Sequence, residues 1–159
     1  MSLAIVPGSF DPMTLGHLDV IEYAASHYKD VVVAVMINRE KSYRFDQDAR
    51  IEIARRTVAH LSNVRVIFDE GMLIDLFDRL GADAVCKGYR NETDYAYEVK
   101  MAEWTREHNP RFRTELIPAK AEHGTLSSTA VRLGMDEGSD LCGMVHPSVI
   151  PLIESNLDK

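Results

Sequence analysis

The stretch Val31-Val32-Val33-Ala34-Val35-Met36-Ile37 decides the fold class of this 159-residue chain. A β-branched run without alternating polar residues is too apolar for a strand that has one face in water. It predicts a central strand that helices cover on both faces. The run is the longest uninterrupted apolar stretch in the chain, and it falls far short of the roughly 20 residues that span a bilayer. We therefore expect no association with a membrane.

On either side of this run, short apolar segments alternate with segments of helical period. The pattern predicts four further strands, at residues 3–6, 64–68, 84–87 and 114–117. It predicts helices at residues 15–27, from Asp46 onward, and at 73–80, 94–108, 127–134 and 148–156.

Apolar side chains at spacings of three and four predict which face of each helix is buried. In the second helix the predicted buried residues are Ile51, Ala54, Val58 and Leu61, and in the fourth they are Tyr97, Met101 and Trp104. Gly81 and Gly134 are expected to end the third and fifth helices, because glycine suits the left-handed position of a helix C-terminus.

Five strands that alternate with helices predict an α/β fold of one domain over residues 1–159. Right-handed crossovers give a doubly wound, five-stranded parallel sheet with helices on both faces. Ligands of such sheets bind beyond the carboxyl ends of the strands. The loops that follow each strand are therefore the expected location of a ligand site.

Composition limits the classes of function. The chain has 18 Lys and Arg residues against 25 Asp and Glu, a formal net charge of −7. This balance argues against a nucleic-acid partner, because affinity for a phosphate backbone comes from clustered basic residues. The two cysteines, Cys86 and Cys142, give neither a disulfide framework nor a thiolate metal cage, so we expect a cytoplasmic protein.

Residues 7–17, Pro-Gly-Ser-Phe-Asp-Pro-Met-Thr-Leu-Gly-His, join the first strand to the first helix. Thr14 lies at the expected N-cap, and the first N–H groups of a helix form a natural anion site. His17 would point at that anion, although a lone histidine there is usually a surface residue. The whole run resembles the T/HxGH signature of the nucleotidyltransferase superfamily, in the form found in phosphopantetheine adenylyltransferases.

Three other loops carry the same resemblance. Lys41 is similar in position to a lysine that contacts substrate phosphates in that family. The segment from Lys87-Gly88-Tyr89-Arg90 to Glu98 resembles the family pattern R-G-x-R followed by D-x-x-Y-E. Residues 126–129, Leu-Ser-Ser-Thr, match its [IL]-S-S-[ST] motif at the start of a helix.

The resemblance implies transfer of the adenylyl group of ATP to 4′-phosphopantetheine, which gives dephospho-coenzyme A and pyrophosphate. The attack would be in line and without a covalent intermediate. His17 would stabilise the transition state, with Lys41 and Arg90 as further catalytic residues. The implied ATP-binding residues are Ser9, Phe10, His17, Gly88, Tyr89, Arg90, Glu98, His123, Gly124, Thr125, Leu126, Ser127, Ser128 and Thr129. The implied acceptor-binding residues are Ser9, Lys41, Leu73 and Lys87.

The resemblance also implies Mg²⁺ that arrives with ATP, without a metal site made by the protein. It implies a homohexamer and inhibition by coenzyme A. Lys87 departs from the family, which usually has arginine at this position. An ammonium group cannot form the two parallel hydrogen bonds that a guanidinium forms with a phosphate, so we expect weaker binding of the acceptor. Residues 122–125 replace an aromatic stretch, so contacts near the adenine should differ.

Other interpretations remain open from the sequence. A cytidylyltransferase that uses CTP is one alternative, although Thr14 stands where those enzymes have a first histidine. A nucleotide-binding regulatory module without catalysis is another. Taken singly, Leu73 and Tyr97 are typical of core residues and Glu98 of a solvated helix face.

Overall fold

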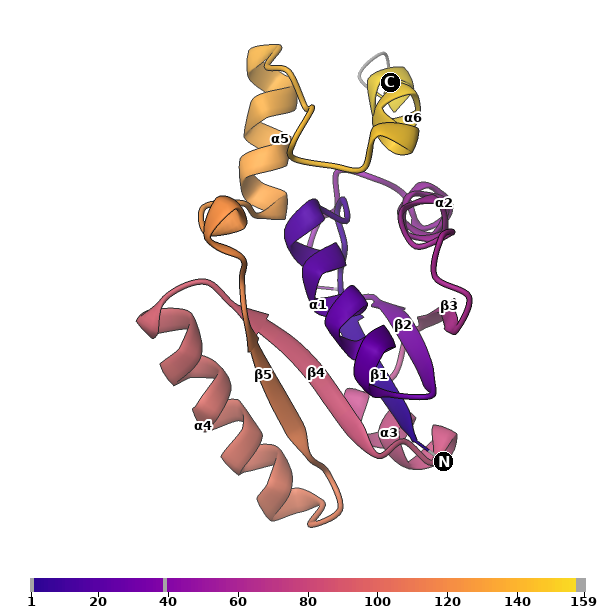
Figure 1. Ribbon diagram of the computed structural model, residues 1–159, viewed down its shortest axis with the longest axis vertical. Helices are drawn as coiled ribbons and strands as arrows, with labels where there is room; N and C mark the ends of the chain where they lie inside the picture. The colour runs from indigo at the N-terminus through magenta and orange to yellow at the C-terminus, as the bar shows by residue number, and fades with distance from the viewer. Residues whose placement is uncertain (1, 39, 157–159) are drawn as a thin grey trace.

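The computed structural model describes residues 2–38 and 40–156, and its described part contains one five-stranded parallel sheet. The strands are β1 (Leu3–Gly8), β2 (Asp30–Met36), β3 (Val64–Asp69), β4 (Ala84–Tyr89) and β5 (Thr114–Pro118), in the spatial order β3-β2-β1-β4-β5 (Figure 1). The helices are α1 (Leu15–His27), α2 (Gln47–Thr57), α3 (Leu73–Leu80), α4 (Glu92–His108), α5 (Ser128–Glu137) and α6 (Ile150–Asn156). Two 3₁₀ turns, η1 (Ala121–His123) and η2 (Pro147–Val149), complete the order. The predicted doubly wound α/β fold is confirmed.

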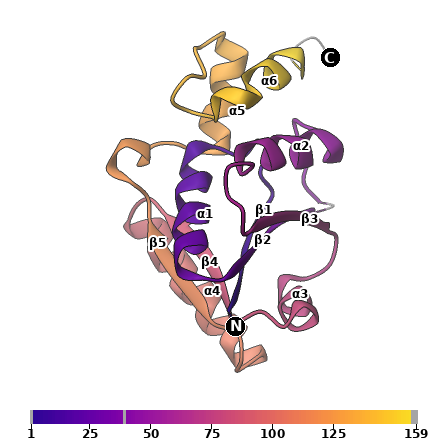
Figure 2. The same cartoon turned by 45° about the vertical axis from the view of Figure 1, so that its right-hand side comes forward.

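β2 lies inside the sheet with apolar layers on both faces, as its sequence predicts. Val31, Val33 and Val35 contribute to the larger apolar cluster, which includes side chains of α1, α2, α5 and α6. Ala34 points to the opposite cluster, which includes residues of α3. α5 and α6 lie beyond the carboxyl ends of the strands, at the top of the view in Figure 2. None of the helices in the described ranges is long and apolar enough to cross a membrane.

Glycine ends two helices, one of them at an unexpected residue. Gly81 follows α3 with a φ of 64°, which confirms the predicted stop. The prediction that Gly134 ends the fifth helix is wrong, because α5 continues to Glu137 and Gly138 follows it with a φ of 71°. Gly134 is buried instead, where a Cβ would lie 3.7 Å from Leu141 Cδ2. The small size of Gly134 therefore lets the segment after α5 pack against this helix.

Two predicted helix faces need correction. In the second helix, Ala54 and Val58 are buried as predicted, although α2 ends at Thr57, so that Val58 and Leu61 lie beyond it. Ile51 and Leu61 are only partly buried, and Ile53, which was not predicted, is fully buried.

The prediction for α4 is wrong for its aromatic residues. Tyr97 is 61% exposed and Trp104 46% exposed, and Met101 is only partly buried. α4 lies at the edge of the sheet, against β4 and β5 (Figure 1). Within residues 2–38 and 40–156, nothing covers Tyr97 and Trp104 fully. Apolar residues at helical spacing indicate an apolar face of the helix. The spacing does not say whether the core of the domain or another surface covers that face.

A buried carboxylate ties the first two loops together. Asp11, in the loop after β1, is 5% exposed and accepts hydrogen bonds from the N–H groups of Arg44 and Phe45, each at 2.9 Å. Arg132 on α5 donates to the Asp11 carbonyl at 2.7 Å, and the Ser128 hydroxyl donates to the Pro12 carbonyl at 2.7 Å. The loops after β1 and β2 and the start of α5 thus hold one another at one end of the sheet.

We expect Asp11→Ala to lower the free energy of unfolding by about 2–4 kcal/mol, because it leaves two backbone donors without their acceptor. Urea titration at constant pH measures this loss. Asp136→Ala is the matched control: it removes the exposed partner of the Arg44 side chain and should cost less than about 1 kcal/mol. Equal losses for the two variants would contradict a special role for Asp11.

Candidate active site

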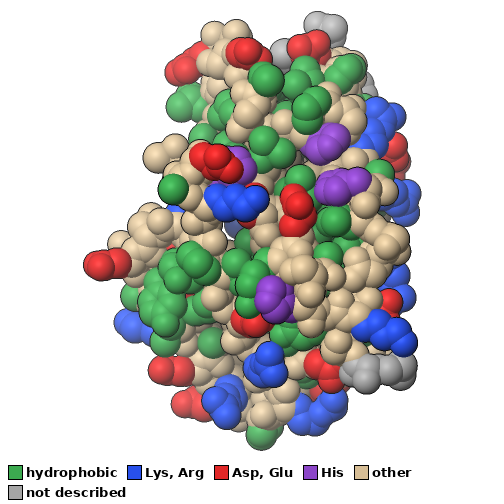
Figure 3. All heavy atoms as spheres, in the orientation of Figure 1, with side chains coloured by type: hydrophobic (Ala, Val, Ile, Leu, Met, Phe, Trp, Pro, Cys, Tyr) green, Lys and Arg blue, Asp and Glu red, His purple; other side chains and the backbone are tan. Residues whose placement is uncertain are grey.

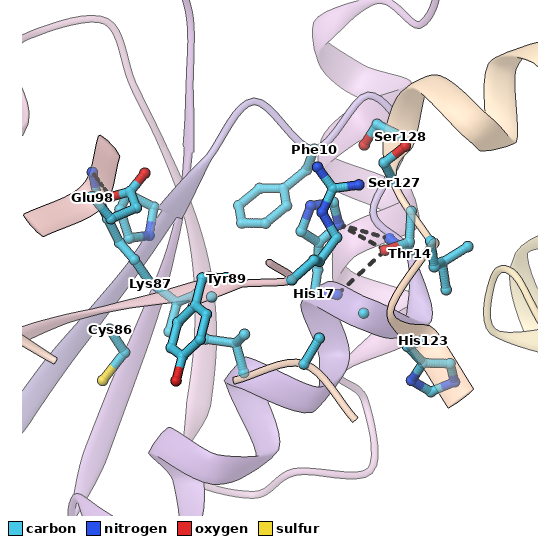
Figure 4. Close-up of a pocket in the computed structure, with 18 of the residues that line it drawn as sticks. Phe10, Thr14, His17, Cys86, Lys87, Tyr89, Glu98, His123, Ser127 and Ser128 are labelled. Carbon is cyan, nitrogen blue, oxygen red and sulfur yellow. Dashed lines mark hydrogen bonds and ion pairs between the residues drawn. The ribbon is translucent and has the colours of Figure 1, made fainter. Parts of the chain in front are cut away.

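A cavity of about 410 Å³ opens between the loop after β1, the first turn of α1, the end of β4 and the start of α5 (Figure 4). Of the residues predicted to bind ATP, those that line it are Phe10, His17, Gly88, Tyr89, Arg90, Glu98, His123, Leu126, Ser127, Ser128 and Thr129. Lys87 lines it as well. Segments far apart in the sequence therefore meet where the sheet topology predicts a ligand site.

The first turn of α1 fixes both the position and the tautomer of His17. The Thr14 N–H donates to His17 Nδ1 at 2.9 Å, and the His17 N–H donates back to the Thr14 hydroxyl at 3.3 Å. Because Nδ1 acts as an acceptor, the proton of the neutral ring is on Nε2. His17 therefore offers a single N–H donor beyond the capping box, on a ring that lines the cavity.

The electrostatic environment keeps this ring neutral. Burial and, as the smaller cause, the nearby Arg90 guanidinium together lower the pKa of His17 from 6.5 to about 4. At neutral pH the ring is thus a hydrogen-bond donor without a full charge. Such a group can stabilise negative charge that grows on a phosphate. Its protonation state does not change near neutral pH.

A second helix N-terminus completes the anion-binding wall. Ser127 caps α5 by accepting from the Ala130 N–H at 3.0 Å, and Ser128 and Thr129 form the first turn. First-turn N–H groups have no acceptor within their own helix, so those of Ser128 and Thr129 are available at the cavity. Two helix dipoles therefore direct their positive ends to one cavity.

On the opposite wall, Lys87 pairs with Glu98. The distance from Lys87 Nζ to Glu98 Oε2 is 3.1 Å, and both side chains are largely buried. Oε2 itself is buried without a hydrogen bond of good geometry to any described residue. Glu98 thus restrains Lys87 at the wall of the cavity.

Arg90 is held at the mouth of the cavity by the start of α4. Its Nε lies 3.1 Å from Asp94 Oδ2, which also accepts from the Arg90 N–H at 3.2 Å. Asn91 caps α4 by accepting from the Asp94 N–H at 2.9 Å. The guanidinium retains donors that a phosphate can use, because Asp94 engages only Nε.

Several predicted residues lie outside this cavity. Ser9 and Leu73 line a neighbouring cavity of about 250 Å³, beside the ends of β1 and β2. Leu73 also lines a groove of about 120 Å³ along α4, together with Met101 and Trp104. Lys87 lines all three spaces, so it stands where they meet.

Lys41 lies in an exposed loop and lines none of these three spaces. Gly124 and Thr125 lie just outside the large cavity, although their neighbours His123 and Leu126 line it. The turn that follows η1 places them there, with the Gly124 N–H bonded to the Ala121 carbonyl at 3.3 Å.

The glycines at the site have a structural reason that sequence reasoning missed. A Cβ at Gly88 would lie 2.7 Å from Val20 Cγ2, and one at Gly8 would lie 2.9 Å from Phe10 Cζ. A larger residue at position 88 would therefore displace Val20 of α1, and one at position 8 would displace the Phe10 ring, whether or not a ligand is bound.

Sequence reasoning also missed Asp19. Its carboxylate is nearly buried on α1 and accepts from His123 Nδ1 at 2.5 Å, with Lys120 Nζ 3.5 Å away. This anchor fixes the ring of His123 at the cavity, where the family commonly has an aromatic stretch. Nothing in the sequence around Asp19 indicates that its partner is His123, about a hundred residues further along the chain.

The described residues contain no group of three or more His, Cys, Asp or Glu side chains that could hold a metal ion. The side chains and dipoles at the large cavity suit anions instead. Lys87, Arg90 and two helix N-termini surround a neutral imidazole donor. Chemically, this arrangement can hold a chain of phosphates and stabilise charge that develops on one of them.

Comparisons with known proteins agree with this chemistry. The cytidylyltransferase-like family matches residues 5–134. The chain is 37% identical over 150 residues to the phosphopantetheine adenylyltransferase of Heliobacterium modesticaldum, and the match covers 94% of this chain and 89% of that protein.

Two solved structures share the fold. A putative nicotinate-nucleotide adenylyltransferase from Vibrio parahaemolyticus has a TM-score of 0.78 at 24% identity, and the match covers 99% of this chain and 95% of that one. A lipopolysaccharide core biosynthesis protein from Thermoplasma volcanium has a TM-score of 0.54 at 20% identity, over 76% and 97% of the two chains.

The environment of His17 predicts its titration. In an NMR pH titration, assigned by comparison with His17→Gln, the ring should titrate near pH 4. The folded pKa lies below the ordinary 6.5, so the contribution of His17 to stability is complete above that pH and is lost as the pH falls toward 4. Arg90→Ala should raise the pKa, because a neighbouring cation disfavours the protonated ring. A wild-type pKa near the ordinary value would contradict this account.

Proposed function

Because the chain belongs to the cytidylyltransferase-like family of nucleotidyltransferases, we propose that it transfers the adenylyl group of ATP to 4′-phosphopantetheine. The products are dephospho-coenzyme A and pyrophosphate. The observation that carries the proposal is the neutral His17 donor, fixed between two helix N-termini at a cavity that adjoins a second one. The high identity to a phosphopantetheine adenylyltransferase over nearly the whole chain supports the choice of acceptor.

In the proposed reaction, an oxygen of the acceptor phosphate attacks the α-phosphorus of ATP. A new phosphorus–oxygen bond forms, the bond from the α-phosphorus to the oxygen it shares with the β-phosphorus breaks, and pyrophosphate leaves. A phosphomonoester is mostly dianionic at neutral pH, because its second pKa is about 6. The nucleophile therefore needs no general base.

The chain's task is then to align two anions and to stabilise the charge that moves between them. His17 would donate from Nε2 to the α-phosphate, most strongly in the transition state. Arg90 and the first turn of α5 would hold the ATP phosphates. Because His17 is neutral, it would add a directed hydrogen bond without titrating in the working range.

We assign the ATP to the large cavity and the acceptor to the two smaller spaces. Ser9 and Lys87 would hold the acceptor phosphate, and Lys87 adjoins all three spaces. The groove with Leu73, Met101 and Trp104 would take the pantetheine arm. Leu73 would thus serve as a substrate contact at the groove's apolar wall.

Lys41 would bind phosphate from a loop outside the three spaces. The side chain starts from a loop outside the three spaces, so a contact with phosphate requires the side chain or its loop to move. The Lys41 N–H closes a turn on the Asn38 carbonyl at 2.9 Å, which places this lysine on the loop that leaves β2.

Magnesium enters the proposal as part of the substrate. Mg²⁺ keeps several waters and binds nucleotide phosphates with few protein ligands. The cationic character of the large cavity suits a nucleotide that brings its own metal.

We further propose a homohexamer, with coenzyme A as an inhibitor that occupies the acceptor spaces. Exposed apolar side chains on and beside α4, among them Tyr95, Tyr97, Trp104 and Met72, support an interface. Figure 3 shows hydrophobic side chains gathered over the N-terminal part of this helix. The mass in solution, by light scattering, tests the assembly.

Incubation with ATP, Mg²⁺ and 4′-phosphopantetheine, with mass-spectrometric identification of the product, tests the reaction. His17→Ala should lower turnover by about 10²–10³-fold, the loss expected for one preorganised donor, while the affinity for ATP survives. CTP in place of ATP is the control for the nucleotide. Near wild-type turnover in His17→Ala, or a preference for CTP, would refute the proposal.

Lys87→Arg should lower the KM for 4′-phosphopantetheine and leave kcat almost unchanged, because a guanidinium binds a phosphate at two points. Glu98, which forms an ion pair with Lys87, should form one with the arginine as well. Steady-state kinetics at saturating ATP measure the change. An unchanged or higher KM would contradict the expected benefit.

A further inference from the structure

Arg50, on α2, is the largest of the fully buried side chains, with 1% of its surface exposed. Its Nη1 donates to the carbonyls of Ser9 at 3.0 Å and Met36 at 3.4 Å, and its Cζ lies 4.0 Å from the centroid of the Tyr43 ring. Ser9 and Met36 both line the cavity of about 250 Å³. One layer of backbone therefore separates the Arg50 guanidinium from that cavity.

The charge of Arg50 has no counter-charge in the described ranges. No carboxylate of residues 2–38 and 40–156 forms an ion pair with it. Its Nε is buried and has no hydrogen-bond partner there. A guanidinium stays charged in a protein, and burying an unpaired charge is costly. An anion in the adjoining cavity would offset that cost.

The bond to Ser9 also orients a backbone donor. The Ser9–Phe10 peptide is trans, so its N–H points opposite to its carbonyl, which Arg50 holds in the interior. The Phe10 N–H has no partner among the described residues. Phe10 has a φ of 49°, a left-handed conformation that a bulky residue adopts only when its surroundings impose it. Arg50 is one of the groups that impose it.

We propose that Arg50 is a positioning residue of the acceptor-phosphate site: it fixes the Ser9–Phe10 peptide and places an uncompensated positive charge beneath the phosphate. This inference rests on the proposed function for the identity of the acceptor. Lys87 supplies charge from the rim of the same cavity, and Arg50 supplies it from below.

The test compares Arg50→Met, Arg50→Gln and Arg50→Lys with a control on the same helix, Arg56→Met. Arg56 is exposed and pairs with Glu52 at 2.9 Å, so its loss should change neither substrate's binding. Arg50→Met and Arg50→Gln should raise the KM for 4′-phosphopantetheine at least about tenfold, the size of a lost charged hydrogen bond. Arg50→Lys restores the charge and should recover most of this loss. The affinity for ATP should fall less than the affinity for the acceptor in every variant, because Phe10 lines the large cavity but not the cavity next to Arg50.

A merely structural role would lower the melting temperature and leave the acceptor KM unchanged, and that result overturns the proposal. An equal loss of ATP and acceptor affinity overturns it as well. Where Arg50→Met does not fold, Arg50→Gln decides.

The wild type separates this inference from the proposed function. If wild-type protein releases no pyrophosphate with 4′-phosphopantetheine, the proposed function fails. Binding of inorganic phosphate, by calorimetry, then decides on Arg50: weaker binding in Arg50→Gln supports the anion site, and equal binding overturns it.

Discussion

The buried carboxylate of Asp11 is the constraint on which the arrangement of the site depends. By accepting from two backbone N–H groups in the loop after β2, it joins that loop to the one after β1. Arg132 and Ser128 bind the same segment from α5, so the positive ends of two helices come to one cavity. This junction holds the helix that starts at Leu15 and the helix that starts at Ser128 at the same end of the sheet.

The electrostatics of the site follow from donors that are fixed before a ligand arrives. His17 is held in one tautomer by Thr14 and kept neutral by burial and by Arg90. Full charges stand around it: Lys87 is restrained by Glu98 and Arg90 by Asp94. These ion pairs hold flexible side chains near their working positions, which reduces the entropy lost on binding. Preorganised dipoles of this kind stabilise a transition state without rearranging when charge moves.

Local sequence signals predicted most of the fold, and the resemblance of the loops to the nucleotidyltransferase superfamily pointed to residues that the structure brings to one cavity. The β-branched run of β2, the N-cap at Thr14 and the stop at Gly81 each depend on neighbouring residues, and each is confirmed. Contacts between distant segments were not predictable in this way: nothing near Asp19 indicates His123, and nothing near Arg50 indicates the carbonyl of Ser9. The wrong assignment of Tyr97 and Trp104 to the core has a different cause, because a helical period does not say what covers the face.

The absence of a side chain at Gly88 has a consequence for how the cavity could be reshaped. Only a hydrogen lies between Gly88 of β4 and Val20 of α1, where a Cβ would come within 2.7 Å of Val20 Cγ2. A side chain at position 88 would press on Val20 and displace α1, so the width of the cavity between them depends on this one hydrogen atom.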